Sequence, residues 1–319
     1  MTAPAKPVFE YLRVSITDRC NLRCIYCMPP EGIQKLQHAQ IIRYEAILAV
    51  VRAAVLEGVH RVRVTGGEPL VRKGIVEFIR ELSAINGLDD ISLTTNGILL
   101  APLAGPLKQA GLRRVNISFD SLRPDRFNRI TRLGKIEDAL LGLEAAVKHG
   151  LSPIKINVVI VPGENDDEID DFGRFAQKTP LVVRFIERMP FLSESLNAPF
   201  VSQAEIMERL SKFIEFEKEY EESGGGPAEV YRIKNGIGKL GFISSRTHPF
   251  CNKCTRLRLT SAGILLPCLD SRDGIEIGSM SQDQLRQSIR ELAKRKRDAA
   301  KPCAKFESAR CVSLSKIGG

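Results

Sequence analysis

The residues best suited to chemistry are three cysteines that lie close together near the start of the chain. Cys20, Cys24 and Cys27 occur in the stretch TDRCNLRCIYC, with the spacing C-x3-C-x2-C. Cysteine thiolates are the usual ligands of iron–sulfur clusters, and three on one loop can hold three irons of a [4Fe–4S] cluster. The fourth iron would keep an open position, as a catalytic metal needs. A structural zinc site is the alternative, although neither a histidine nor a fourth cysteine lies close in sequence.

A second group of three cysteines lies in the last third of the chain, with the spacing C-x2-C-x13-C. Its members are Cys251, Cys254 and Cys268. The stretch between them alternates, so Arg256 and Arg258 leave the same face of a short strand beside the cysteines. Arginine is suited to bidentate recognition of phosphate. The residues alone leave two hypotheses open here: a second iron–sulfur cluster, or a zinc ribbon with His248 as its fourth ligand.

The chain between the two groups alternates short apolar strands with amphipathic helices. Six strands are predicted, at residues 11–17, 61–65, 91–96, 113–120, 153–160 and 181–187. The clearest helical periodicity covers 44–58 and 134–150, and each segment ends in glycine. Strands that alternate with helices predict parallel βαβ units. Right-handed crossovers then favour either a doubly wound sheet or a TIM-like barrel.

The predicted strands carry a polar face, which decides between these two architectures. Four members of that face are Arg13, Arg63, Ser118 and Lys155. Parallel strands that are buried on both faces are nearly continuous apolar runs. The polar face therefore predicts an α/β fold in which a partial TIM-like (βα)6 barrel encloses a polar lumen and a large polar ligand. Asp120, at the end of one strand, could act as a base, but an isolated aspartate at a strand end is more often structural.

The sequence changes character after residue 190. Residues 222–242 are rich in glycine and lack the βα rhythm, and residues 281–298 predict a polar helix. We expect an α+β appendix that caps one end of the barrel and carries the second cysteine group. The predicted domains are therefore 1–190, the barrel, and 191–319, the appendix.

Composition and charge limit the classes of function. The net charge of +9 and a pI near 9.2 suit anionic partners such as nucleotides. A zinc-containing nucleic-acid binder is disfavoured, because aromatic residues make up only 6% of the chain and tryptophan is absent. The sequence contains no P-loop and no G-x-G-x-x-G motif. It shows neither a signal peptide nor a run of about 20 apolar residues, so we expect a cytoplasmic protein without membrane contact. In that compartment, cysteines are expected to serve metal binding or catalysis rather than to form disulfides.

The first cysteine motif, with Tyr26 before its last cysteine, resembles the radical SAM (S-adenosylmethionine) superfamily. TGGEP at residues 65–69 is similar to the SAM-binding motif of that superfamily. Two glycines would let the backbone approach the methionine part of SAM closely. Glu68 would accept from its ammonium group or orient the loop. The resemblance implies that SAM is cleaved by one electron to methionine and a 5′-deoxyadenosyl radical.

Further stretches resemble one family within that superfamily, the GTP 3′,8-cyclases of molybdenum cofactor biosynthesis. They include VRVTGGEPLVR, AGLRRVNISFDSL, VRFIERMP and FCNKCTRLRLT, and the chain ends in Gly318-Gly319. The resemblance implies a second [4Fe–4S] cluster, which binds guanine through its open iron. The implied GTP contacts are Arg13, Arg63, Thr94, Lys155, Arg256, Leu257 and Arg258. The implied SAM contacts are Tyr26, Gly67, Ser118 and Met189. The Gly318-Gly319 tail is implied to reach into the active site.

In that family the radical takes the 3′ hydrogen of GTP, and C3′ then bonds to C8, which gives 3′,8-cyclo-7,8-dihydro-GTP. The resemblance implies a reductant protein and a downstream pterin-forming enzyme as partners, and it leaves both a monomer and a homodimer open. A peptide-modifying radical SAM enzyme is the competing hypothesis, but such enzymes often carry more C-terminal cysteines. The chain departs from the family at Thr255, where asparagine is usual, and in its tail, where Cys303 and Cys311 are interpreted as ordinary thiols.

Overall fold

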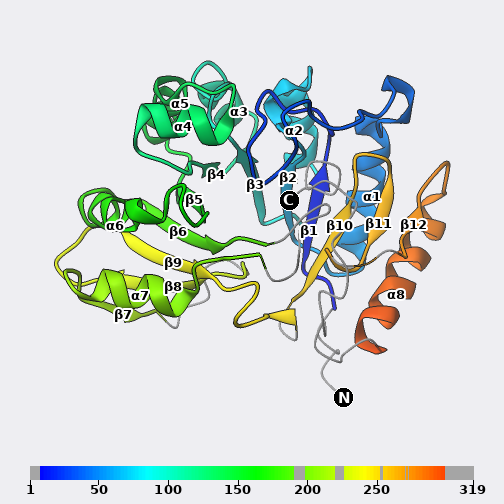
Figure 1. Cartoon of the computed structure of the whole chain (residues 1–319). Coiled ribbons are helices and arrows are strands. Elements are labelled where there is room, and N and C mark those ends of the chain that lie inside the picture. The colour runs from blue at the N-terminus through cyan, green and yellow to red at the C-terminus, as the bar shows by residue number, and fades with distance from the viewer. Residues whose placement is uncertain are drawn as a thin grey trace.

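A computed structural model describes residues 8–189, 198–219, 226–251, 254–269, 271 and 273–298. These residues form a 12-stranded sheet with the order β12-β11-β10-β1-β2-β3-β4-β5-β6-β9-β8-β7 (Figure 1). Its six central strands pair in parallel and in chain order. They are β1 (Tyr11–Ser15), β2 (Arg61–Thr65), β3 (Asp90–Thr95), β4 (Arg114–Ser118), β5 (Lys155–Ile160) and β6 (Val182–Glu187). The six strands predicted from the sequence are confirmed, with ends that differ by up to two residues.

Helices connect the central strands, as the alternating pattern predicts. They are α1 (Tyr44–Leu56), α2 (Ile75–Ser83), α3 (Ala104–Gln109), α4 (Pro124–Thr131), α5 (Ile136–Lys148) and α6 (Ile169–Lys178). The helix predicted at 44–58 corresponds to α1, which buries Ile47, Val50 and Val51 on one face. Gly58 follows it with a φ of +100°, a backbone conformation that glycine adopts without strain. The segment predicted at 134–150 corresponds to α5.

The two faces of the central sheet differ as predicted. Leu12, Val14, Val62 and Val64 are fully buried in the apolar core, which the helices share. Burying one such side chain contributes about 1.5–3 kcal/mol to folding. On the other face, the strand register places Arg13 beside Arg63 of β2. The pleat of the strands therefore keeps the polar side chains together on one surface.

The C-terminal strands extend the sheet at both edges, whereas the sequence predicted an appendix that caps one end of the barrel. β10 (Arg256–Leu259) pairs in parallel with β1, and β9 (Lys239–Ile243) pairs in parallel with β6. β11 (Ile264–Leu266) and β12 (Ile275–Glu276) continue from β10, while β8 (Glu229–Ile233) and β7 (Phe216–Lys218) continue from β9, all antiparallel. An open sheet leaves unpaired N–H and C=O groups at both edges, and these strands pair with them.

Two further helices accompany these strands. α7 (Gln203–Ser211) packs on α6, and α8 (Gln282–Asp298), which corresponds to the predicted polar helix at 281–298, packs on α1 (Figure 1). Arg286 and Arg290 of α8 both pair with Glu57 at the end of α1. No helix in the described part of the chain is long and apolar enough to span a bilayer.

Candidate active site

The first cysteine group lies on a loop that leaves the C-terminal end of β1 and is fixed to the end of α4. Backbone N–H groups of Arg23 and Ile25 donate to the carbonyls of Thr131 and Ile130, both at 3.0 Å. Arg132, directly after α4, donates from one guanidinium nitrogen to the carbonyls of Arg23 and Met28, both at 2.9 Å. Its φ of +64° is uncommon for a residue with a side chain. This clamp, which the sequence analysis missed, fixes the loop before any ligand binds.

Gly66 and Gly67, at the end of β2, allow the same loop to approach closely. A Cβ on Gly66 would lie 2.6 Å from the carbonyl oxygen of Thr17, and a Cβ on Gly67 would overlap the carbonyl oxygen of Arg19. The N–H of Gly67 donates to Thr17, and the N–H of Glu68 donates to Arg19, both at 2.8 Å. From the sequence, these glycines were expected to make room for SAM. In the structure, the backbone of the cysteine loop takes up the space that their side chains would need.

Glu68 holds the end of β2 against the end of β3. Its carboxylate, which is 1% exposed, accepts from the backbone of Leu70 at 3.0 Å and of Asn96 at 2.7 Å, and from the Thr95 hydroxyl at 2.8 Å. Burial raises the pKa of Glu68 to about 7, although these hydrogen bonds oppose the shift. Of the two roles considered from the sequence, this geometry supports orientation of the loop.

Asp120 and Tyr26 connect the cysteine loop to β4. The Tyr26 hydroxyl donates to Asp120 at 2.6 Å, and the backbone N–H of Val159 donates to the other carboxylate oxygen at 2.8 Å. Burial raises the pKa of Asp120 to about 6 and raises the pKa of Tyr26 well above its usual value. These hydrogen bonds support the structural role that is more usual for an isolated aspartate at a strand end.

The chemistry of the three thiols fits an iron–sulfur cluster, whose binding would displace the thiol protons. Burial raises the pKa of Cys20 to about 11 and of Cys27 to about 12, and it also raises the pKa of Cys24. A buried thiolate needs positive charge nearby. Iron would supply that charge when it replaces the proton of each thiol. In the part of the chain that the structure describes, no three His, Cys, Asp or Glu side chains converge on one metal ion. A cluster does not require such convergence, because each cysteine binds a different iron.

The second cysteine group lies at the opposite end of the strands. Cys251 and Cys254 precede β10, which is parallel to β1, whereas the first loop follows β1. Cys268 follows β11, which is antiparallel to β10 and so returns the chain to the end where Cys254 lies. His248, the fourth ligand in the zinc hypothesis, is exposed, and its Nδ1 lies 3.2 Å from the Thr247 hydroxyl.

Cations surround Cys254. Arg256 Nε donates to the Cys254 sulfur at 3.3 Å, and Lys296 Nζ donates to it at 3.6 Å. Lys296 also donates to the carbonyls of Arg256 and Pro267, both at 2.9 Å, so α8 ties the start of β10 to the end of β11. Burial alone would raise the pKa of Cys254, but Arg256 and Lys296 outweigh it and lower the pKa to about 7. Lys296 was not identified from the sequence, because nothing local distinguishes it from the other basic residues of α8.

Cations also line the polar face between the two cysteine groups. The register of β10, β1 and β2 aligns Arg258, Arg13 and Arg63. Further along the sheet, burial and the neighbouring arginines lower the pKa of Lys155 to about 6 and that of Arg184 to about 9. Burying several cations close together costs free energy unless an anion binds among them. Arg184 was not selected from the sequence, although its position between Val183 and Phe185 follows the same alternation.

The other predicted contacts are placed as follows. Thr94, Ser118 and Met189 are half-buried. Leu257 is fully buried in the apolar core, so only its main chain is available to a ligand. Cys303, Cys311, Gly318 and Gly319 lie outside the described residues.

Comparison with known proteins places the chain in a family. The sequence profile of the Radical SAM superfamily matches residues 14–176, and that of Molybdenum Cofactor Synthesis C matches residues 181–302. A protein of Pelotomaculum thermopropionicum named GTP 3′,8-cyclase is 51% identical over 271 residues, which are 84% of this chain and 83% of that protein. The chain belongs to the GTP 3′,8-cyclase family. The protein of Geobacter sulfurreducens with the same name is 43% identical over 320 residues, covering 97% of each chain.

Solved structures share the fold of this family member. The structure of anSMEcpe with bound AdoMet superposes with a TM-score of 0.58 and 18% identity, over 93% of this chain and 86% of that one. The structure of Streptococcus suis SuiB bound to S-adenosylmethionine gives a TM-score of 0.58 and 15% identity, over 88% and 68% of the two chains. At these identities, the likeness supports the fold alone.

Proposed function

We propose that the chain is a GTP 3′,8-cyclase that cleaves SAM at one end of its lumen and cyclises GTP from the other end. One observation carries this proposal: the two cysteine groups lie at opposite ends of β1 and β10, in opposite electrostatic surroundings. Glu68 and Asp120 are buried near the first group, whereas Arg256 and Lys296 contact the second. SAM carries positive charge and GTP carries negative charge, so each end suits one of the two molecules.

The first group would hold the cluster that opens SAM. Cys20, Cys24 and Cys27 are its proposed ligands, and SAM would occupy the open iron. The proposed SAM contacts are Tyr26, Gly67, Ser118 and Met189. When bound, the cluster and SAM supply a 5′-deoxyadenosyl radical. The clamp of Arg132 and the close approach at Gly66 hold this loop in place before binding, and such preorganisation reduces the cost of positioning the reactants.

The second group would hold a second [4Fe–4S] cluster and orient GTP. Cys251, Cys254 and Cys268 are its proposed ligands, and the base of GTP would bind its open iron. The proposed GTP contacts are Arg13, Arg63, Thr94, Lys155, Arg256, Leu257 and Arg258. The guanidinium groups would bind the triphosphate in a bidentate manner, and the main chain of Leu257 would supply the remaining contact.

The length of the strands fits the reaction. β1 has five residues, which at about 3.3 Å each gives roughly 13 Å between its ends. SAM held at one end and GTP held at the other can therefore bring the adenosyl group and the ribose of GTP together between the two ends. Removal of the 3′ hydrogen and bonding of C3′ to C8 would leave a radical on the base, and one electron from the reductant protein with one proton would then give 3′,8-cyclo-7,8-dihydro-GTP. The enclosing sheet keeps water from the reacting carbon.

The remaining proposals concern the organisation and partners of the protein. We assign residues 1–190 to the radical-generating unit and 191–319 to the GTP and second-cluster unit. The Gly318-Gly319 tail would reach into the active site. In the cytoplasm, a reductant protein would supply the electron, and a downstream pterin-forming enzyme would use the product of this first step of molybdenum cofactor biosynthesis.

Anaerobic reconstitution with iron and sulfide tests these assignments. We expect about eight irons per chain from two [4Fe–4S] clusters, and about four after alanine replaces either cysteine group. Replacement of Cys303 and Cys311 with alanine is the matched control and should retain about eight. With SAM, dithionite and GTP, mass spectrometry should detect 5′-deoxyadenosine and an isomer of GTP of unchanged mass. SAM cleavage that leaves GTP intact would contradict the assignment of the substrate.

A further inference from the structure

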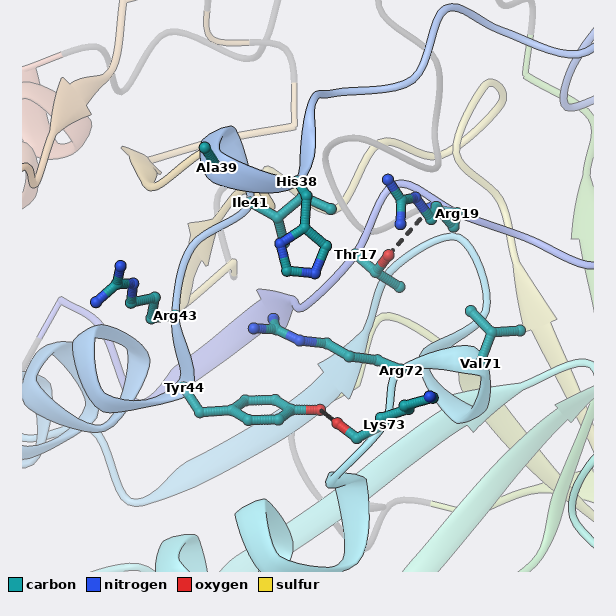
Figure 2. Close-up of a pocket in the computed structure, with 10 residues that line it drawn as sticks. All are labelled: Thr17, Arg19, His38, Ala39, Ile41, Arg43, Tyr44, Val71, Arg72 and Lys73. Atoms are coloured by element: carbon teal, nitrogen blue, oxygen red, sulfur yellow. Dashed lines mark hydrogen bonds between the residues drawn. The ribbon is translucent and has the colours of Figure 1, made fainter.

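A basic pocket lies beside the first cysteine loop, where the proposed mechanism does not use it. The pocket has a volume of about 900 Å³. Three short segments form it, and its lining residues are Thr17, Arg19, His38, Ala39, Ile41, Arg43, Tyr44, Val71, Arg72 and Lys73 (Figure 2). Its wall includes Arg19, which directly precedes Cys20 in the chain. The side chains of His38, Arg43 and Lys73 at its border are exposed, so the pocket is open to a partner from outside the sheet.

The lining of this pocket carries positive charge, and the acidic side chain of Glu45 interacts with Arg72. Arg19, Arg43, Arg72 and Lys73 line it, and no acidic residue is among its described lining residues. Arg72 has structural partners, because its guanidinium donates to the carbonyls of Ile16 and Ile42 and lies 3.9 Å from the centre of a tyrosine ring. The side chains of the other three form no hydrogen bond or ion pair with the described part of the chain. Figure 2 labels these four cations among the lining residues.

The location of the pocket matters for electron supply. Reduction of the first cluster needs one electron from outside, and a donor protein is too large to enter the lumen. Electron transfer weakens steeply with distance, so the donor must approach the outer side of the Cys20 loop. Arg19, in the wall of the pocket, belongs to that loop: its carbonyl accepts from the backbone N–H of Glu68, and its own N–H donates to the Thr17 hydroxyl at 3.1 Å. The pocket thus reaches from solvent to the residue before a cluster ligand.

We propose that this pocket docks an acidic one-electron donor protein, whose carboxylates bind Arg43 and Lys73. The inference rests on the proposed function, because it requires a reducible cluster at Cys20, Cys24 and Cys27. The donor loses one electron and the cluster gains it, so no proton or other reactant is needed. Complementary charge accelerates such encounters and makes the rate depend on salt.

Charge reversal outside the catalytic machinery tests the docking site. The variant Arg43→Glu/Lys73→Glu lowers the net charge from +9 to +5. The control Lys148→Glu/Lys212→Glu makes the same change at exposed residues near the ends of α5 and α7. The donor is reduced flavodoxin, an acidic FMN protein, and stopped-flow absorbance follows cluster reduction in the reconstituted full chain without GTP. Dithionite serves as a small donor that needs no docking.

We expect flavodoxin to reduce the pocket variant at least about tenfold more slowly than the wild type at low ionic strength. The control should stay within about twofold, and dithionite should reduce all three proteins equally. Salt should slow the reduction of the wild type by flavodoxin and should not slow that of the pocket variant.

Equal rates of reduction by flavodoxin for the wild type and the pocket variant would overturn the proposal, as would slower reduction of the pocket variant by both donors. Binding of pyrophosphate that the pocket variant lacks, with an unchanged flavodoxin rate, would instead assign the pocket to a free anion. A separate incubation with SAM, GTP and reduced flavodoxin tests the proposed function: reduction of the cluster without cyclisation of GTP there would contradict that function and leave the docking result valid.

Discussion

Replacing Lys155 with glutamine should change how many protons accompany the binding of GTP. Burial, together with Arg184, Arg114 and Arg63, lowers the pKa of Lys155 to about 6. At pH 8, about 1% of the free protein would therefore carry a proton on this amine. A triphosphate in the lumen favours the charged form, so binding should take up close to one proton. Charging the amine at pH 8 costs about 2.7 kcal/mol, from two pH units at 1.36 kcal/mol each, and the ligand must supply this energy.

Isothermal titration calorimetry at pH 8, in buffers with different ionisation enthalpies, measures this proton uptake. The terminal phosphate of GTP is already deprotonated at this pH. Arg184, whose pKa is about 9, is about nine-tenths protonated and so adds only about 0.1 proton to the uptake. We expect uptake of about one proton for the wild type and for Lys212→Gln, which removes an exposed lysine, and about zero for Lys155→Gln. Absence of uptake by the wild type, or equal uptake by Lys155→Gln, would refute the reasoning about the lumen.

The same group affects stability in the absence of ligand. The pKa of Lys155 in the folded protein lies below its usual value of 10.5. Between pH 6 and 10.5 the unfolded chain binds more protons at this site, so stability from this residue rises with pH across that range. We expect the difference in unfolding free energy between wild type and Lys155→Gln to change in this direction in urea titrations. An opposite slope would contradict the assigned shift.

Three further variants test the surroundings of the two cysteine groups. Gly67→Ala should displace the first cysteine loop, which should cost about 1–3 kcal/mol of folding stability. The iron content measured after reconstitution should fall, and full iron content would contradict the close approach. Lys296→Met removes a donor to a cysteine sulfur, so the potential of the second cluster should fall in an EPR redox titration, whereas Lys294→Met, at an exposed site on the same helix, should leave it unchanged. Glu187→Ala removes a buried carboxylate that accepts from three backbone N–H groups; at about 1–3 kcal/mol per unpaired group, urea unfolding should show a loss of several kcal/mol, and a loss below about 1 kcal/mol would argue against these bonds.

The central strands could be predicted because their signals are local. The alternation of Arg13 with Leu12 and Val14 repeats on successive strands, and it identifies both the apolar face and the polar face. The polar face favoured a TIM-like barrel over a doubly wound sheet, and strands in such a barrel follow one another in chain order. The pairing of β10 with β1 could not be predicted, because the two strands are far apart in sequence. The alternation of residues within a strand does not indicate which other strand it pairs with.

The candidate site divides in the same way. The cysteines were identified by their spacing, and several lumen cations by strand alternation. Arg132 and Lys296 act through hydrogen bonds to main-chain carbonyls that only the folded chain brings near. Gly66 and Gly67 were recognised as a site of close approach, but the sequence could not show that the approaching group is the cysteine loop.

A deuterium label on GTP tests the central claim most directly. The reconstituted protein would be given SAM, dithionite and GTP that carries deuterium at the ribose 3′ position. Because the radical takes that hydrogen, deuterium should appear in the 5′-deoxyadenosine measured by mass spectrometry, together with cyclised GTP that has lost it. Formation of 5′-deoxyadenosine without deuterium, with the label retained in GTP, would contradict the proposed cyclase reaction.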